Sequence, residues 1–295
     1  MPVADASRII AAMGQALGPD IIEQVRALYD AQQAPLAAAM PPLAADLPYG
    51  PHPRNRLDIY RADAPPPATP LPILVFVHGG GFLKGDKGGA AWPNANVGRM
   101  AARAGLLGVV INYRLAPDDV WPAGAQDVAA TVEWLVANAA QYGGDAGKII
   151  LMGTSAGAVH VAACLARNDA AAQHVRGAVL LSGLYGYTPL DERDCIYYGP
   201  AAQYPARMPK SGVNGAPGGP DVPLFIACAQ HDPARFQAEF LGLMNDRLAR
   251  DGTMPRAHMA SGHNHYSMAM HLGSADTRLS TDILAFIASI VEPTS

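Results

Sequence analysis

A serine between two glycines separates an apolar segment from a run of small residues. The pentapeptide Gly153-Thr154-Ser155-Ala156-Gly157 follows residues 149–152, whose side chains are all apolar. Such a strand, turn and helix pattern strains the serine backbone and lifts its hydroxyl clear of the sheet. Glycine is needed on both sides, because a side chain there would collide with the neighbouring strand or helix. The pattern predicts a nucleophilic hydroxyl at Ser155.

A base and an orienting acid are needed to activate such a hydroxyl. Asp232 comes after the apolar segment 222–227, and His265 comes after the short segment 257–260. Catalytic groups of open α/β sheets lie on loops beyond the carboxyl ends of the strands. The chain order Ser155, Asp232, His265 therefore predicts a catalytic triad.

His263 competes with His265 for the role of base. The pair could also bind a metal ion, but a zinc site needs a third and usually a fourth ligand. His258 or His271 would then have to be recruited. We expect no metal and no cofactor.

The segment His78-Gly79-Gly80-Gly81-Phe82 follows the apolar residues 73–77. Glycines allow the backbone to approach a substrate closely and to turn its N–H groups inward, where they can stabilise an oxyanion. The N–H of Ala156, directly after the nucleophile, would complete this oxyanion hole. His78 is expected to orient the glycine loop through a hydrogen bond.

Aromatic residues near the predicted mouth of the site are Phe82, Trp92, Tyr185 and Tyr187. They are candidates for substrate contact, although aromatic side chains most often pack in the core. Glu239 and Asp246 are expected to face solvent on a helix.

Segments that are apolar at every residue alternate with helical patterns, which predicts a mostly parallel sheet covered by helices on both faces. Two helices open the chain, residues 35–53 are expected to be a linker, and residues 57–60 an edge strand. Residues 211–220, rich in glycine and proline, are expected to form a loop. Further strands are predicted at 73–77, 106–111, 149–152, 178–181, 222–227 and 257–260, and helices at 123–141, 156–167, 236–248 and 279–290.

The chain has 295 residues, of which 50% are hydrophobic and 16% charged, with a formal net charge of -4. This composition suits a folded enzyme and provides no basic face for nucleic acid or acidic membranes. No signal peptide or membrane span is expected. Cys164, Cys195 and Cys228 are expected to be buried, reduced thiols of a cytoplasmic protein.

These motifs together resemble an α/β-hydrolase of the hormone-sensitive-lipase type, a group of bacterial esterases. The resemblance rests on four segments in order: 78–82, 112–117, 142–157 and 262–266. It implies the α/β-hydrolase fold with a small N-terminal helical cap at residues 1–50 and a catalytic domain at residues 51–295. It also implies an oxyanion hole at Gly80 and Gly81, an acid at Asp232, and His265 rather than His263 as base.

Two departures leave the substrate open. Thr154 stands where the family usually has aspartate, and residues 182–190 and 262–266 look closer to arylformamidase-like relatives. The expected activity is a serine carboxylesterase acting on small, fairly apolar esters. The alternatives are an arylformamidase or amidase with the same triad, and a receptor built on a hydrolase fold. The oligomeric state, a homodimer included, stays open.

Overall fold

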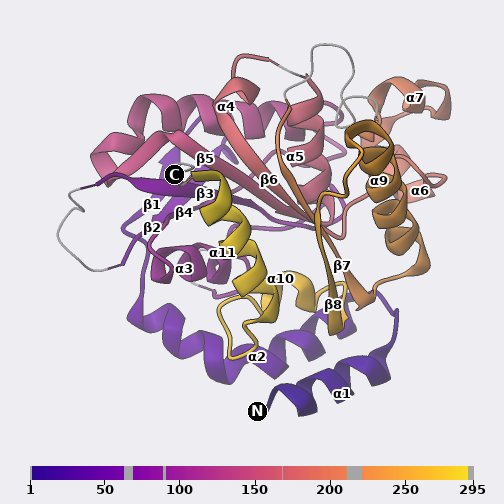
Figure 1. Ribbon diagram of the computed structural model, residues 1–295, viewed down its shortest axis with the longest axis horizontal. Helices are drawn as coiled ribbons and strands as arrows, with labels where there is room; N and C mark the ends of the chain where they lie inside the picture. Colours follow the sequence, from indigo (N-terminus) through magenta and orange to yellow (C-terminus); the bar gives the residue numbers. More distant parts are fainter. Residues whose placement is uncertain (1, 63–68, 89–90, 168, 211–220, 292–295) are drawn as a thin grey trace.

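A central β-sheet organises the molecule (Figure 1). The computed structural model describes residues 2–62, 69–88, 91–167, 169–210 and 221–291; the loop expected at residues 211–220 lies outside them. Eight strands in this part of the chain form the sheet. They are β1 Ala44–Pro48, β2 Arg56–Tyr60, β3 Leu71–Val77, β4 Leu107–Ile111, β5 Gly144–Thr154, β6 Val175–Leu181, β7 Leu224–His231 and β8 Arg256–Asn264.

The sheet is mostly parallel, as the sequence predicted. Its strand order is β1-β2-β4-β3-β5-β6-β7-β8. Only β1 with β2 and β2 with β4 pair in the antiparallel sense. The carboxyl ends of β5, β7 and β8 therefore lie at the same edge of the sheet, where the segments with the candidate triad follow.

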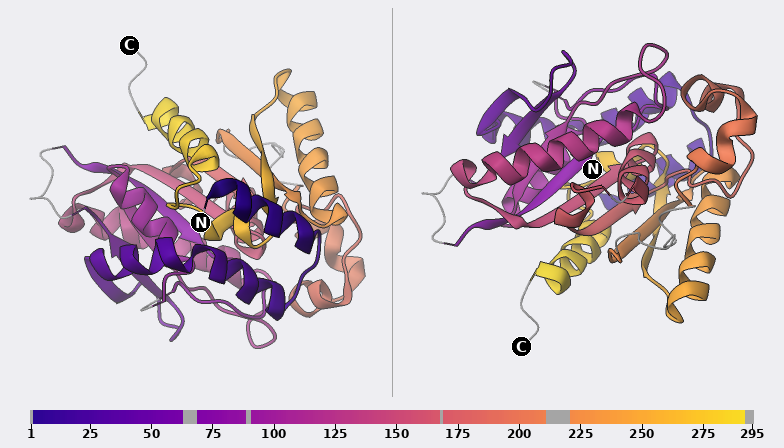
Figure 2. Two further views of the ribbon diagram at one scale, coloured as in Figure 1. Left: turned by 90° about the horizontal axis from the view of Figure 1, so that it is seen from below. Right: turned by 90° about the horizontal axis from the view of Figure 1, so that it is seen from above.

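Helices cover both faces of the sheet (Figure 2). Alternate residues of β3 face opposite sides: Val75 and Val77 enter one apolar core, and Leu74 and Phe76 the other. The first core is closed by helices α4 Ala123–Asn138, α5 Ala156–Arg167 and α9 Ala234–Asp251. The second is closed by α3 Ala95–Arg103, α10 Ser267–Met270 and α11 Arg278–Val291. Burial on both faces explains why the central strands are continuously apolar.

The prediction of a linker at residues 35–53 was wrong. Helix α2, Pro19–Ala39, continues through Pro35, and β1 follows as a strand. A proline removes one helical hydrogen bond, but α2 is held by burial of Val25, Tyr29 and Gln33. Because β1 forms the edge of the sheet, the prediction of an edge strand at residues 57–60 was also wrong: β2 lies between β1 and β4.

The N-terminal helices pack against the C-terminal part of the fold, α1, Val3–Met13, beside β8 and α2 beside α10 (Figure 1). Helices α1 and α2 share a cluster formed by Ile10, Val25, Tyr29 and Trp92. They are tied to the C-terminal part of the chain by two sets of hydrogen bonds. The N–H of Gly18 donates to the Tyr266 hydroxyl at 2.9 Å, and the Gln33 amide donates to the carbonyls of Met270 and Leu272.

Several short elements were not predicted from the sequence. Between β6 and β7 the chain forms the short helices α6 Glu192–Tyr198 and α7 Tyr204–Arg207. Three 3₁₀ turns lie at Ala139–Tyr142, Ala172–His174 and Ala201–Gln203. Helix α3 was also missed.

The cysteine prediction was correct for two of the three residues. Cys164 and Cys228 are buried, whereas Cys195 is exposed on α6, and all three are free thiols. No helix among the described residues is long and apolar enough to cross a membrane.

Close packing at the turn between β5 and α5 leads to a first prediction. A Cβ on Gly157 would overlap the carbonyl oxygen of Val77 on β3, which is backbone and cannot rotate away. Gly157→Ala should lower the free energy of unfolding by about 1–3 kcal/mol, the usual cost of overpacking. Urea titration followed by circular dichroism measures this loss.

Gly147→Ala is the matched control, because Gly147 is exposed and its added Cβ would approach only the Asp145 side chain at 3.1 Å. A Gly157→Ala protein as stable as this control would contradict the packing argument.

Candidate active site

Ser155 stands at the turn between β5 and α5 with a left-handed backbone, φ 53°. Its N–H donates to the carbonyl of Leu181 on β6 at 2.8 Å. Added Cβ atoms on Gly153 or Gly157 would overlap backbone atoms across the turn. The two flanking glycines thus allow the close packing that holds the serine in a strained conformation, as the sequence pattern predicted.

Asp232 and His265 meet Ser155 at this edge of the sheet. His265 Nε2 lies 2.9 Å from Ser155 Oγ, and its Nδ1 lies 2.7 Å from Asp232 Oδ1. Asp232 is fully buried, and His265 is 8% exposed. The three residues are spread over 110 positions of sequence between Ser155 and His265. They form a continuous chain of hydrogen bonds from carboxylate to hydroxyl.

The Asp232 carboxylate is held by two further donors. Its Oδ2 accepts hydrogen bonds from the Ser182 hydroxyl at 2.6 Å and from the N–H of Ala229 at 2.7 Å. Ser182 directly follows β6 and has a left-handed backbone, φ 49°. Sequence reasoning missed this role of Ser182; its one signal was its position directly after a predicted strand next to the nucleophile's strand.

His263 lies in a separate buried group. Its Nδ1 is 3.0 Å from Ser267 Oγ, and its Nε2 is 3.2 Å from Asp276 Oδ2. Asp276 also accepts hydrogen bonds from Arg278. The geometry therefore brings His265, and not His263, to Ser155. Within the described ranges, no group of three or more His, Cys, Asp or Glu side chains could hold a metal ion.

The glycine loop after β3 has the unusual backbone that its sequence predicted. Gly80 and Gly81 have φ of 136° and 60°. His78 Nδ1 donates to the carbonyl of Gly79 at 2.6 Å, and the His78 ring stacks on Tyr113. Burial lowers the pKa of His78 to about 4, so its imidazole is neutral and one ring nitrogen carries the donated proton. Across the loop, a Cβ on Gly79 would lie 3.2 Å from the Cβ of Ser155.

A buried apolar cluster packs beside the candidate triad. Phe82 stacks on Tyr197 of α6 with ring centroids 4.5 Å apart, and Phe236 packs against the His265 ring at 4.2 Å. Phe82, Ala156 and Phe236 belong to one apolar cluster with residues of α6. Phe82 is thus near the reacting groups, as predicted, and Phe236 is a neighbour that the sequence did not reveal.

The other aromatic candidates lie elsewhere. Trp92 packs under α1 and α2, and its indole N–H donates to Asp30. Tyr185 is buried in the core beneath α9. The Tyr187 ring lies against Gly242, and its hydroxyl donates to Asp246 at 2.6 Å. These contacts are packing interactions, and the role of the three aromatics as pocket residues stays a prediction. Asp246, expected to face solvent, accepts the hydrogen bond of the Tyr187 hydroxyl.

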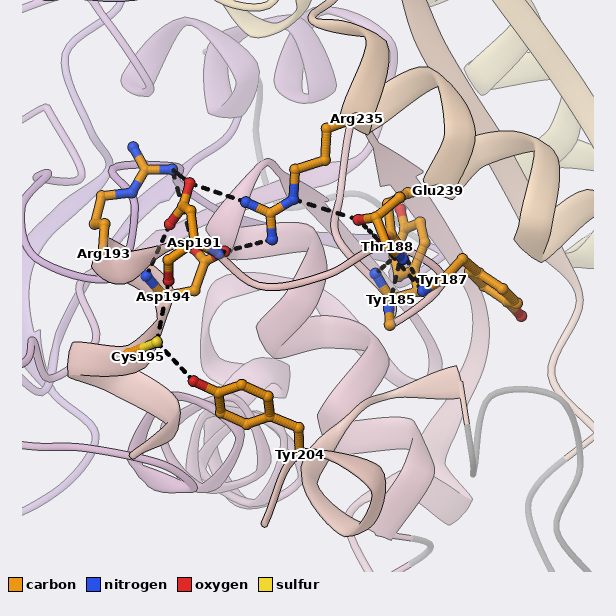
Figure 3. Close-up of polar contacts among 11 residues, drawn as sticks. Tyr185, Tyr187, Thr188, Asp191, Arg193, Asp194, Cys195, Tyr204, Arg235 and Glu239 are labelled. Carbon is orange, nitrogen blue, oxygen red and sulfur yellow. Dashed lines mark hydrogen bonds and ion pairs between the residues drawn. The ribbon is translucent and has the colours of Figure 1, made fainter. Parts of the chain in front are cut away.

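Glu239 was also predicted to face solvent, and this was wrong (Figure 3). It is 1% exposed, and its carboxylate accepts hydrogen bonds from the N–H groups of four consecutive residues after β6. These are Tyr185, Gly186, Tyr187 and Thr188, and the Thr188 hydroxyl adds a fifth. A buried carboxylate is stable only when its oxygens are satisfied in this way. Glu239 therefore fixes the loop that leads to α6.

Comparison with protein families and characterised relatives finds hydrolases. A family model described as BD-FAE matches residues 57–182. A probable isoprenylcysteine alpha-carbonyl methylesterase of Oryza sativa subsp. japonica is 40% identical over 129 residues, which cover 44% of this chain and 29% of the relative. Carboxylesterase NlhH of Mycobacterium tuberculosis is 32% identical over 193 residues, covering 56% of this chain and 57% of the relative. The chain thus spans less than two thirds of the relatives it matches.

Solved structures match over almost the whole chain. A hyperthermophilic esterase from the archaeon Pyrobaculum calidifontis has a TM-score of 0.69 at 22% identity and covers 98% of both chains. Esterase LipW from Mycobacterium marinum has a TM-score of 0.68 at 24% identity, covering 94% of this chain and 92% of its own. These matches show that the fold is that of the α/β-hydrolases.

Buried imidazoles beside the glycine loop lead to a prediction about pH. Burial, followed by the neighbouring His78, lowers the pKa of His160 to about 3. An unfolded histidine has a pKa near 6.5, so below pH 6.5 the unfolded chain binds protons that the folded protein excludes. The contribution of neutral His160 to the free energy of unfolding is therefore fully present above pH 6.5 and declines as the pH falls toward 3. One such imidazole should lower the free energy of unfolding by about 2 kcal/mol between pH 7 and pH 5.

His160→Gln replaces the titrating ring with a neutral amide, so the free energy of unfolding should fall less steeply below pH 6.5, even if the variant is less stable at pH 8. Urea titrations at pH 5, 6, 7 and 8 measure both slopes. Parallel curves for the two proteins would contradict the explanation.

Proposed function

We propose that this chain, an α/β-hydrolase related to the hormone-sensitive-lipase-like esterases, is a serine carboxylesterase. The observation that carries the proposal is the pair of hydrogen bonds at His265: 2.9 Å to the Ser155 hydroxyl and 2.7 Å to the Asp232 carboxylate. A serine activated in this way attacks carbonyl carbon. The esterase names of the relatives support the same reaction class.

The proposed reaction begins at Ser155. Its oxygen attacks the ester carbonyl while His265 Nε2 takes the hydroxyl proton, and Asp232 stabilises the imidazolium. His265 then gives this proton to the departing alcohol, which leaves an acyl-enzyme on Ser155. Water, deprotonated by the same imidazole, hydrolyses the acyl-enzyme and restores the serine.

The negative charge that develops on the carbonyl oxygen is assigned to three N–H groups, those of Gly80, Gly81 and Ala156. Ala156 is the first residue of α5, and the N–H of a first helical residue has no acceptor inside its helix. Gly80 and Gly81 have the positive φ angles that allow a loop to turn its N–H groups inward. Each such donor contributes about 3 kcal/mol to lowering the barrier.

The proposed substrates are small esters with an apolar part, because Phe236 packs against the His265 ring and belongs to one apolar cluster with Phe82 and the tyrosines of α6. Helices α1 and α2 are proposed to act as a cap that limits substrate size. They are attached beside the proposed base His265, because the hydroxyl of Tyr266, the next residue, accepts a hydrogen bond from the N–H of Gly18.

Ser155→Ala tests the proposed nucleophile. Loss of the attacking oxygen should lower kcat for p-nitrophenyl butyrate by about 10⁶-fold. A fluorophosphonate probe should label the native protein at Ser155 and leave the variant unlabelled, as mass spectrometry would show. A native protein that neither turns over the ester nor takes the label would favour a receptor role. Turnover of N-formyl-kynurenine with negligible ester cleavage would favour an arylformamidase.

Ser182 is proposed to position Asp232, which gives a second test. Ser182→Ala removes the 2.6 Å hydrogen bond to the buried carboxylate, so kcat should fall about tenfold with little change in KM, because hydrogen bonds to charged groups are strong. Steady-state kinetics measure both constants.

Ser182→Gly is the matched control for backbone strain. Glycine also lacks the hydroxyl, but it accepts the positive φ of this position without cost. Equal losses in both variants identify the hydroxyl as the cause. A glycine variant with native kcat would show that the hydrogen bond is unimportant.

A further inference from the structure

A guanidinium group lies over the proposed oxyanion loop. A Cβ on Gly81 would be 3.3 Å from three atoms of Arg193: Cζ, Nε and Nη1. The guanidinium of Arg193 therefore lies directly against Gly81. Because backbone bonds near Cα are about 1.5 Å long, the group lies within about 6 Å of the Gly81 nitrogen. Nothing in the esterase reaction described above uses this cation.

The helix that carries Arg193 is firmly held (Figure 3). Asp191 and Asp194 form a capping box at the start of α6. Arg235, in the first turn of α9, donates to Asp191 at 2.9 Å and also to Asp194. On the other side, Tyr197 of α6 stacks on Phe82, the residue after Gly81. The backbone of Arg193 is thus fixed relative to the oxyanion loop from both directions.

Arg193 itself is only loosely paired. Its nearest carboxylate oxygens, on Asp191 and Asp194, are 3.8 and 4.0 Å away, beyond hydrogen-bonding distance. The closer bonds to both carboxylates come from Arg235. Among the described residues Arg193 donates no hydrogen bond, and its side chain is 43% exposed. A planar guanidinium with open donors matches a carboxylate in geometry and charge.

An exposed cation thus lies at the loop that would hold the ester carbonyl. The loop residue Phe82 is anchored in the buried apolar cluster of Phe236 and the α6 tyrosines, so the glycine backbone next to it is held in place beside Arg193. A carboxylate a few bonds from that carbonyl would reach the guanidinium. Neutral esters of the same length would leave the donors of Arg193 to water.

We propose that Arg193 is a specificity-determining residue that selects esters carrying a carboxylate near the scissile carbonyl, of which monoesters of short dicarboxylic acids are the simplest. This inference rests on the proposed esterase function and narrows its substrate class from apolar esters to amphipathic, anionic ones. Arg193 binds the substrate carboxylate and takes no part in bond cleavage.

The experiment compares monoethyl glutarate and monoethyl succinate with ethyl succinamate, a neutral amide similar in size to the succinate. Ethanol release gives kcat/KM for each. The native protein should prefer the carboxylates, and Arg193→Gln should lower the ratio of kcat/KM for carboxylate over amide about tenfold, mainly through KM. Arg193→Lys keeps the charge but not the bidentate geometry, so its ratio should lie between the two.

Arg256→Gln is the matched control. Arg256 is exposed at the start of β8, the end of the strand opposite to the proposed site, and its loss changes net charge equally. Its ratio should equal that of the native protein. The native preference should also shrink in 0.5 M salt, because the partly exposed pair is screened.

The outcomes distinguish a failure of the Arg193 proposal from a failure of the esterase proposal. Equal loss on the carboxylate and amide esters in Arg193→Gln, which leaves their ratio unchanged, would overturn the inference, since it would place the charge effect on the oxyanion instead. Native kcat/KM for both esters would overturn it as well. In both cases Ser155-dependent turnover of p-nitrophenyl butyrate would leave the esterase proposal intact, whereas loss of that turnover in the native protein would remove the esterase proposal itself.

Discussion

The strained backbone at Ser155 is the constraint on which the rest of the site depends. A non-glycine residue at φ 53° costs about 1–3 kcal/mol and persists only where its surroundings enforce it. Here the enforcement comes from backbone packing around Gly153 and Gly157 and from the N–H of Ser155 donating to β6. Phe82 and Ser182 have the same left-handed backbone. Asp46 and Asn94 are the other non-glycine residues with positive φ in the described part of the chain, so three of these five residues belong to the candidate triad, to the glycine loop or to the groups that donate to Asp232.

Two buried carboxylates, those of Asp232 and Glu239, hold further segments around Ser155 in place. Asp232, directly after β7, is satisfied by His265, Ser182 and Ala229, and its bond to His265 holds the proposed base directly after β8. Glu239 is satisfied by the N–H groups of residues 185–188, which fixes the loop leading to α6. An unsatisfied carboxylate in either place would be costly. The need to hydrogen-bond these buried carboxylates thus also sets the positions of His265 and of α6, the helix beside the glycine loop.

The sequence predicted the parts of the molecule that have local signals. Continuous apolar segments identified the central strands, and glycine patterns identified the turn at Ser155 and the loop at Gly80 and Gly81. The missed features depend on tertiary contacts. Helix α2 passes through Pro35 because its buried face holds it, and Glu239 is buried because a distant loop turns four N–H groups toward it. Trp92 and Tyr187 show that the sequence around an aromatic residue does not reveal which segments it packs against: Trp92 joins a cluster with α1 and α2, and Tyr187 lies against Gly242 of α9.

The proposed chemistry of Ser155 and the proposed choice of substrate have separate structural origins. The proposed nucleophile, base and acid lie at strand ends of the sheet, whose geometry is set by backbone pairing. Arg193 lies on α6, a short helix inserted between β6 and β7 and held by side chains: Asp191, Asp194 and Arg235 on one side, Tyr197 on the other. Substitutions on this helix can change surface charge without disturbing the pairing of β5, β7 and β8. If the proposed function holds, one acyl-transfer mechanism would therefore serve different esters through changes in this inserted segment alone.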